Sequence, residues 1–259
     1  MSLPPAATAS ADAVAQPKEL ADSLRTDRMI NIYVGKATPE AKPFRVQQVL
    51  LEQLSEYFSN ALSADTFVEG KKARLNFPED DVDAWKVLLR WAFTHTVPHW
   101  TKKMAGKIEM VFVDCWVLGD KYQIRSFQNE VMMEMLYYYT CNSGSFEVLR
   151  HGVEQTSSGS KLRRLMAEEV VAGVDVGKQG FDLDQFDGMR FLKDYVQAKQ
   201  RLSGHEWCSR GYAAATRFGG NCDATINAGP GGTWKEYMVG DKLPHRAWKW
   251  DITSKAWAA

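Results

Sequence analysis

The sequence is poor in cysteine and carries no net charge. Its four cysteines, Cys115, Cys141, Cys208 and Cys222, include no Cys-x-x-Cys pair. Cysteines this sparse fit a reducing compartment better than a secreted disulfide scaffold. Lys+Arg and Asp+Glu both number 32, so the formal charge is zero and no overall field draws the chain toward nucleic acid or an anionic membrane. We therefore expect neither nucleic acid nor a membrane as a partner.

The sequence also lacks the marks of export. It shows no basic flank followed by an apolar run near its start, no uninterrupted apolar stretch long enough to span a bilayer, and no Asn-x-Ser/Thr acceptor. A signal peptide needs the first of these features, and a membrane-spanning helix needs about 20 mainly apolar residues in a row. The expected location is therefore the cytoplasm or the nucleus.

Apolar residues are abundant enough to build a core. Hydrophobic residues make up 45% of the 259 positions and aromatic residues 12%, which suffices for one core and a second, smaller one. The first residues are instead rich in Ala, Ser and Pro and offer little to bury. We expect residues 1–26 to form a disordered or short-helix leader.

Three short alternating segments predict a small sheet. Ile30, Ile32 and Val34 lie two residues apart, which is the period of a half-buried strand. A second extended segment covers residues 43–46, and the simplest geometry joins it to the first as an antiparallel hairpin. A third alternating segment at residues 73–77 predicts another short strand.

Apolar residues three to four positions apart predict helices in much of the remaining chain. Asp80 or Asp81 is placed to cap the second of these helices, and Ser126 is placed to cap the fourth. The helical periodicity covers residues 49–58, 85–93, 107–118, 127–136, 162–170 and 191–202.

Breaks in these patterns predict the domain organisation. The run Asn-Ser-Gly-Ser at residues 142–145 interrupts the helical period, and from Ser203 the composition changes to Gly and Trp. We expect an α+β fold class, with a small sheet flanked by a helical bundle. The predicted parts are the leader, a folded domain, a helical C-terminal segment and a Gly- and Trp-rich irregular tail, at residues 1–26, 27–140, 141–203 and 204–259.

Seven short motifs follow one another in the predicted folded domain. They are Phe44-Arg45-Val46-Gln47-Gln48, Leu50-Leu51, Ser55-Glu56-Tyr57-Phe58, Leu75-Asn76-Phe77-Pro78-Glu79-Asp80-Asp81, Trp91-Ala92-Phe93-Thr94, Leu118-Gly119-Asp120-Lys121-Tyr122 and Phe127-Gln128-Asn129. Their order and spacing resemble the BTB/POZ domain, and in particular its filamentous-fungal branch. The resemblance covers about half of the chain and implies a BTB/POZ fold for that half.

Two positions depart from the pattern of this family. Met29 stands at the start of the first strand, where many members have Asp, and Gln47 stands where members have His. In many BTB domains these polar residues lie near a charged pocket of the dimer. The resemblance therefore implies the fold, but it does not carry over a role built on that pocket, such as recruiting a repressor.

The resemblance implies a protein-interaction module that self-associates, with a homodimer as the expected assembly. The expected surface comprises the segment before the first strand, that strand and the helix that starts at Gln47, where apolar burial would drive pairing. The residues expected to take part are Met29, Ile30, Ile32, Gln47, Leu50, Leu51, Leu54 and Phe58. The identity of any other protein partner stays open.

A second interpretation is a substrate adaptor for a cullin-based ubiquitin ligase. Phe67-Val68-Glu69 resembles the hydrophobic-x-Glu segment with which some family members dock on the cullin scaffold, so Phe67 and Glu69 would make that contact. An ordinary loop with Phe67 tucked onto the core explains the same three residues. The chain after residue 140 shows no clear long helical extension of the kind that strengthens cullin binding.

No pattern predicts a catalytic site, a cofactor or a metal ion, and we expect no enzymatic activity. Residues 182–193 fail as a calcium loop because Asp187 and Lys193 occupy the positions that need Gly and Glu. The tail contains four residues of the types that bind zinc: His205, Cys208, Cys222 and His245. Their spacing matches no common zinc finger.

The tryptophans of the tail allow several interpretations. They can pack back onto the helical part, belong to a partly disordered tail, or form an aromatic patch that binds a peptide, since Trp is frequent at interface hot spots. We expect packing or partial disorder. An enzyme site in the tail is the alternative from a different functional class. The residues concerned are Trp207, Trp234, Trp248, Trp250 and Trp257.

Overall fold

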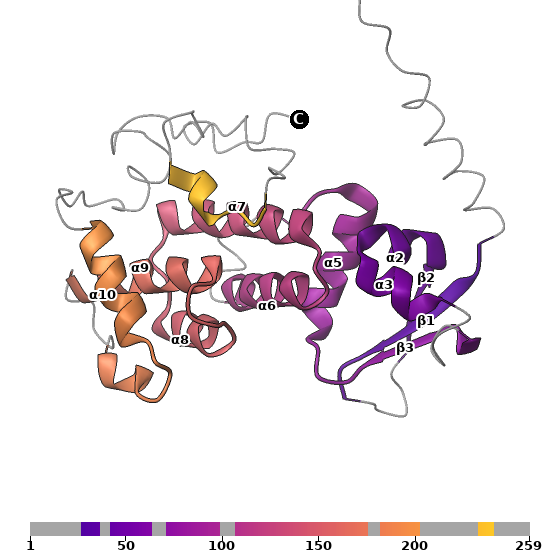
Figure 1. Ribbon diagram of the computed structural model, residues 1–259, viewed down its shortest axis with the longest axis horizontal. Helices are drawn as coiled ribbons and strands as arrows, with labels where there is room; N and C mark the ends of the chain where they lie inside the picture. Colours follow the sequence, from indigo (N-terminus) through magenta and orange to yellow (C-terminus); the bar gives the residue numbers. More distant parts are fainter. Residues whose placement is uncertain are drawn as a thin grey trace, which may run out of the picture. The chain divides into compact units, whose positions relative to one another are not determined.

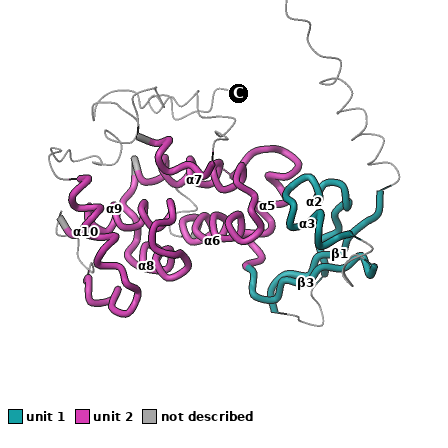
Figure 2. Tube along the Cα trace, in the orientation of Figure 1, with its two compact units in different colours: residues 1–80 teal, residues 81–259 magenta. Residues whose placement is uncertain are grey.

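The chain has an α+β fold that is mostly helical (Figure 1). Its described residues contain eight α-helices and one three-stranded sheet, which confirms the predicted α+β class. Two compact units are present, unit 1 (residues 1–80) with the sheet and unit 2 (residues 81–259) with most of the helices (Figure 2). The computed structural model describes residues 27–36, 42–63, 71–98, 107–175, 182–202 and 233–240.

The sheet of unit 1 has the strand order β2-β1-β3. β1 (Met29–Val34) pairs antiparallel with β2 (Phe44–Gln47) and parallel with β3 (Arg74–Phe77). Ile30 and Ile32 on β1 are fully buried, as the two-residue period requires. The predicted hairpin and the predicted third strand are both confirmed.

The single helix predicted after the second strand is two helices. α2 (Gln48–Leu54) ends at Ser55, whose backbone is extended with φ −166° and ψ 161°, and α3 (Glu56–Leu62) begins directly after it. Ser55 occupies the N-cap position of α3, but its side chain makes no capping hydrogen bond. Leu51 of α2 and Phe58 of α3 are both fully buried. The prediction of one helix was wrong because the apolar period continues across the break.

Unit 2 begins with α5 (Val82–Thr94), which the sequence predicted with a capping aspartate. The carboxylate of Asp81 accepts a hydrogen bond from the backbone N–H of Ala84 at 2.8 Å, so Asp81 and not Asp80 is the cap. The buried face of the helix includes Trp85 and Leu88, which are fully buried. The predicted apolar stripe is therefore the face that packs into the core.

α6 (Lys107–Lys121) and α7 (Arg125–Cys141) form the next packed pair. A Cβ added at Gly119 of α6 would lie 2.6 Å from a side-chain carbon of α7, so the close approach of the two helices requires a glycine there. The predicted cap Ser126 lies inside α7, because the N-cap is Ile124 and its side chain makes no capping bond. That capping prediction was wrong by two residues.

The remaining helices pack in succession along the chain. α8 (Phe146–Glu154) packs against α6 and α9 (Lys161–Asp175), and α9 packs against α10 (Leu192–Leu202), with the short 3-10 helix η2 (Leu183–Phe186) before α10. Ser145 caps α8 by accepting a hydrogen bond from a backbone N–H of its first turn at 3.4 Å. The two helical stretches predicted here are confirmed.

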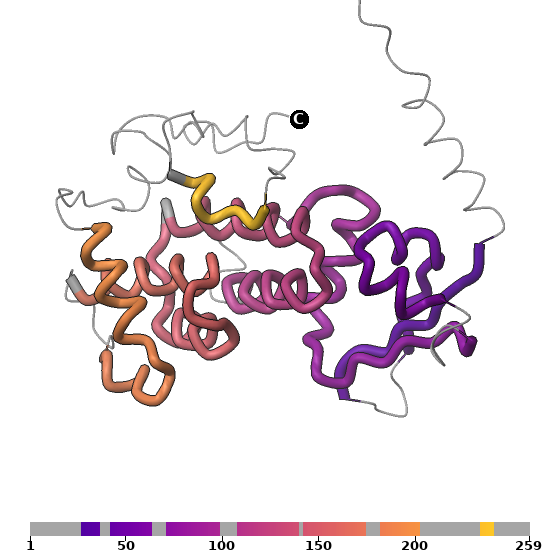
Figure 3. Tube along the Cα trace, viewed as in Figure 1, coloured from indigo at the N-terminus to yellow at the C-terminus, as the bar shows by residue number. Residues whose placement is uncertain are grey.

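A short segment of the tail returns to the helices of unit 2. The 3-10 helix η3 (Thr233–Tyr237) packs against α7 and α9, and Figure 3 shows it in yellow beside α7. Trp234 is fully buried there, which agrees with the packing interpretation for this tryptophan. Trp207, Trp248, Trp250 and Trp257 lie outside the described residues.

The compact units divide the chain elsewhere than at the boundary predicted after residue 140. The division falls between Asp80 and Asp81. Helices on the two sides of residue 141 belong together, because α8 packs against α6 as well as against α9. The predicted leader and most of residues 204–259 lie outside the described residues.

Candidate protein-interaction surface

The interaction residues predicted in unit 1 lie on β1, β2, α2 and α3. Met29 at the start of β1 is the register partner of Gln47 at the end of β2, and α2 begins at the next residue. Leu50 and Leu54 lie four positions apart on α2, so they share one face of the helix. The fold thus places these four residues on elements that follow one another directly.

Four other predicted residues lie in the core. Ile30, Ile32, Leu51 and Phe58 are each 0% exposed. The ring of Phe58 meets the ring of Phe77 edge-on, with centroids 6.4 Å apart and planes at 87°. These side chains stabilise the fold of unit 1, and a partner that binds the folded chain does not reach them.

The apolar residues that face outward form a smaller set, which we call the α2 surface: Met29, Leu50, Leu54 and Tyr57. Met29 is 37% exposed and Tyr57 41%, while Leu50 and Leu54 are half-buried. Tyr57 was not among the predicted residues, although it follows Leu54 by three positions in the same apolar run. Its ring packs edge-on against the ring of Phe58, with centroids 5.3 Å apart.

A carboxylate is present beside β1, although Met29 occupies the position at which the family resemblance expects one. Asp27, two residues earlier, accepts a hydrogen bond from the backbone N–H of Val49 at 2.7 Å. This bond satisfies one of the free N–H groups in the first turn of α2, where a negative charge is also favoured by the helix dipole. The sequence reasoning missed Asp27 because only the pairing of β1 with β2 brings it to this helix end.

Polar side chains continue from this helix end along α2. Arg28 donates two hydrogen bonds to Oε1 of Gln48, at 3.0 and 2.8 Å, and Nε2 of Gln48 donates to Glu52 at 2.6 Å. Gln47 itself is half-buried. A half-exposed apolar area with hydrogen-bonded polar residues beside it has the composition of an interface core and its rim.

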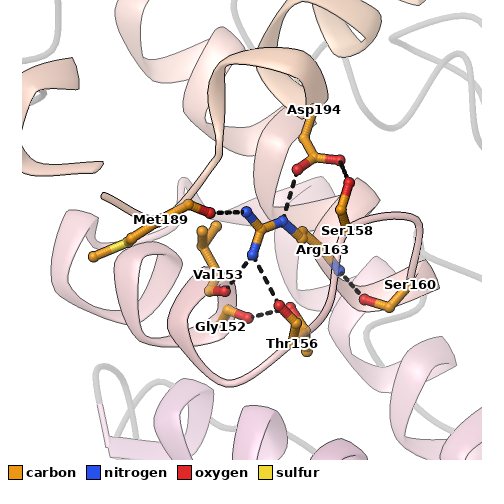
Figure 4. Close-up of polar contacts among 8 residues, drawn as sticks. All are labelled: Gly152, Val153, Thr156, Ser158, Ser160, Arg163, Met189 and Asp194. Atoms are coloured by element: carbon orange, nitrogen blue, oxygen red, sulfur yellow. Dashed lines mark hydrogen bonds and ion pairs between the residues drawn. The ribbon is translucent and has the colours of Figure 1, made fainter. Parts of the chain in front are cut away.

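A buried polar cluster lies in unit 2 around Arg163 (Figure 4). Nε of Arg163 donates to Asp194 at 2.7 Å, and its terminal nitrogens donate to the carbonyl oxygens of Val153 at 2.7 Å, Thr156 at 2.8 Å and Met189 at 2.5 Å. The carbonyls of residues 153 and 156 lie at the C-terminal end of α8, where helix carbonyls lack helical partners. Arg163 therefore works as a buried cap that joins α8, α9 and α10.

Cys115 also lies in a structural setting. The thiol of Cys115 on α6 is fully buried and lies 3.8 Å from the carbonyl oxygen of Ala84. Burial raises the pKa of this thiol well above its usual value, and the nearby carboxylate of Asp114 adds to the effect. A thiol that stays protonated is a poor nucleophile, so Cys115 offers no covalent chemistry near neutral pH.

Several predicted features fall on residues that the structure does not describe. Phe67 and Glu69, the cullin-type pair, lie outside the described residues, as do the four zinc-type residues His205, Cys208, Cys222 and His245. Within the described ranges, no group of three His, Cys, Asp or Glu side chains is placed to hold a metal ion. Among the described helices, none combines the length and apolar content that crossing a membrane requires.

Comparison with known proteins finds no family model and no curated protein that matches the chain.

Proposed function

We propose that the chain is a BTB/POZ-type protein-interaction module that self-associates through unit 1. Support comes from the order of its elements: a strand hairpin, two short helices, a third strand parallel to the first, an acidic corner that caps α5, and then α5 itself. The motifs that resemble the family fall on these elements in the same order. We propose that these elements form a BTB/POZ fold.

The observation that carries the proposal is the α2 surface. Its four side chains keep apolar area outward in a unit whose interior is already filled by residues such as Ile30, Leu51 and Phe58. Full burial of a large apolar side chain contributes about 1.5–3 kcal/mol. Burial of the part that is still exposed contributes about half of that for each residue of the α2 surface. A two-fold dimer counts each residue twice.

The resulting gain, roughly 6–12 kcal/mol by the same area argument, is of the same size as the association cost of about 4–15 kcal/mol, so this surface alone supports at most a weak dimer. We therefore expect a reversible dimer that depends on concentration, with the hydrogen-bonded residues beside the α2 surface contributing to its rim. An obligate dimer would need a larger and more apolar interface.

The test measures the mass of the full chain by size-exclusion chromatography with light scattering. We expect the wild type to shift from monomer toward dimer as its concentration rises from the low into the high micromolar range. Leu54→Asp and Leu50→Asp place a charge in the α2 surface and should keep the chain monomeric over this range. Both residues are partly exposed, so folding should tolerate the charge.

The matched control is Phe93→Asp. Phe93 on α5 is 60% exposed, so this variant adds the same charge at an apolar surface position outside unit 1. We expect it to dimerise like the wild type. A wild type that stays monomeric at the highest concentration would refute the proposal, and so would an equal loss of dimer in Phe93→Asp.

A further inference from the structure

A tail segment distant in sequence is held by the helices of unit 2. Residues 233–240 lie on α7 and α9 (Figure 3), and residues 203–232 separate them in sequence from the end of α10. The hydrogen-bond partners Asn129 and Val239 are 110 positions apart. The segment therefore meets the helices as a separate strip of chain.

Its side chains are anchored like those of a bound peptide. Trp234 is 0% exposed, Tyr237 2% and Met238 4%, while Lys235 and Glu236 between the anchors face outward. Buried aromatic anchors carry most of the energy in protein and peptide recognition. The spacing of three residues between the two aromatic anchors follows from the 3-10 turn of η3.

Its backbone is recognised by one amide side chain. Asn129 on α7 accepts a hydrogen bond from the N–H of Val239 at 2.7 Å and donates one to the carbonyl oxygen of the same residue at 3.1 Å. Asn129 is itself 0% exposed. Both polar groups of one backbone residue are thus satisfied without help from the tail, as occurs when a protein binds an extended peptide.

Charged groups of α9 complete the contact. The hydroxyl of Tyr237 donates to the buried carboxylate of Glu168, and the guanidinium of Arg164 lies 4.8 Å from the centre of the Tyr237 ring. Arg164 also donates to Glu236 at 2.6 Å. The Tyr237 ring, its hydroxyl and the neighbouring Glu236 each contact a complementary group on α9. This face of the helices therefore fits the chemistry of the segment.

We propose that the face formed by α7 and α9 is a peptide-recognition site, and that residues 233–240 are a ligand held there in cis. The site takes a peptide with two aromatic residues three positions apart and an acidic residue just before the second aromatic residue. It also binds the backbone N–H and carbonyl of the residue two positions after the second aromatic residue. Glu168 contacts the hydroxyl of the second aromatic residue, Arg164 contacts the acidic residue, and Asn129 contacts the backbone N–H and carbonyl. A partner protein would bind with a segment of this chemistry and would have to displace residues 233–240.

The competition between the two ligands sets the design of the test. A ligand that belongs to the same chain as its site acts at an effective concentration of about 1 mM, so the wild type should bind an added peptide weakly. The probe is a fluorescently labelled synthetic peptide of residues 231–242, followed by anisotropy with the full chain. We expect the variant Trp234→Ala to bind the probe about tenfold more tightly than the wild type, because it frees the site.

Two controls assign the binding to this face. A probe with the same composition in scrambled order should not bind the Trp234→Ala chain, and adding Asn129→Ala to that chain should weaken binding of the correct probe. Equal binding of the probe to the wild type and to Trp234→Ala would overturn the proposal. Absence of binding to both, or binding of the scrambled probe, would also overturn it.

A second measurement avoids any change in the buried residues. A protease site inserted within residues 203–232 allows the otherwise unaltered full chain to be cut. We expect the cut tail to co-elute with the rest of the chain and to be replaced when the labelled probe is added in excess. If the tail leaves on cutting and the remaining chain binds no probe, or loses its helical circular dichroism, the segment is an integral part of the fold and the proposal is wrong.

Discussion

The two units of the chain keep their polar groups in different places. All nine polar or charged residues that are buried in the described chain belong to unit 2, including Arg163, Glu168 and Asp194. In the described part of unit 1 the polar contacts, around Asp27 and Arg28 at the start of α2 and between Arg74 and Asn76 on β3, are exposed or half-buried. Unit 1 is filled by apolar packing alone, whereas unit 2 ties its helices together with buried charges.

This difference indicates different demands on the two units. A buried charge needs its partner at a fixed position, so the ion pairs of unit 2 permit one arrangement of α8, α9 and α10. Unit 1 has no buried charge among its described residues, while exposed large apolar side chains occur in both units, such as Met29 in unit 1 and Leu192 in unit 2. The exposed apolar area of the α2 surface can contact a second copy of the chain, which is the basis of the proposed self-association.

The largest expected effect follows from removing the central charge of unit 2. Arg163→Met keeps the length of the side chain but leaves Asp194 buried without its cation, and the side chains of the two residues are only 5% and 7% exposed. Breaking a buried pair on one side costs about 3–5 kcal/mol. All nine tryptophans lie in unit 2, so urea unfolding followed by Trp fluorescence reports the loss.

Arg150→Met is the matched control for this measurement. Arg150 pairs with Glu154 at 2.9 Å on the surface of α8, with side-chain exposures of 46% and 40%, and a surface pair of this kind contributes about 0.3–0.5 kcal/mol. Equal destabilisation by the two variants would show that burial of charge does not distinguish unit 2.

Unit 1 should respond with similar size to a purely apolar change. Phe58→Ala removes a fully buried ring that packs against Phe77, and truncating a buried Phe to Ala typically costs about 3–5 kcal/mol. Unit 1 contains no tryptophan, so amide hydrogen exchange in β1 and α3 is the suitable readout. Unchanged exchange there would contradict a core held by apolar packing.

A smaller effect is expected at the start of α2. Asp27→Ala removes the carboxylate that accepts the N–H of Val49, and loss of a helix cap costs about 1 kcal/mol. Amide exchange in α2 should become faster, while Asp27→Asn, which retains an acceptor oxygen, should preserve most of the protection. Equal exchange in the two variants would mean that the bond does not stabilise the helix.

The sequence predicted the local elements of unit 1 better than the contacts between elements. The period of two at Ile30 and Ile32 led to the correct strand, and the apolar period after β2 led to helical structure there, although as one helix instead of two. The break at Ser55 was missed because the apolar pattern continues through it, and the family resemblance gave no sign of it. The burial of each side chain in the structure shows which predicted interaction residues lie in the core and which lie at the surface. The sequence pattern alone does not make this distinction.

The polar contacts of unit 2 could not be predicted in the same way. Arg163 meets Asp194 and the carbonyl of Met189, and Asn129 meets Val239, across 31, 26 and 110 positions. Nothing in the spacing of single polar residues specifies such pairings, since they depend on how whole helices pack. The signal of the tail segment was present in part, because Trp234 belonged to the group of tryptophans for which packing was expected.

The smallest expected effect concerns pH and the pair His151–Asp114, which joins α8 to α6. Nε2 of His151 lies 2.7 Å from Asp114, and the side chains are 27% and 24% exposed. The hydrogen bond to Asp114 raises the pKa of His151 above its ordinary value of 6.5, although partial burial opposes the shift and the charge of Glu154 supports it. The folded state therefore favours the protonated imidazole.

The sign of the pH dependence follows from this direction. The contribution of the pair is fully present below about pH 6.5, the unfolded pKa, and is lost as the pH rises through the higher folded pKa. Because the pair is partly exposed, its contribution should not exceed about 1 kcal/mol. Urea unfolding by Trp fluorescence from pH 5.5 to 8.5 should show the stability difference between the wild type and Asp114→Asn shrinking as the pH rises. A difference that stays constant or grows would show that the imidazolium does not hold α8 against α6, and that charge stabilises unit 2 only where it is deeply buried.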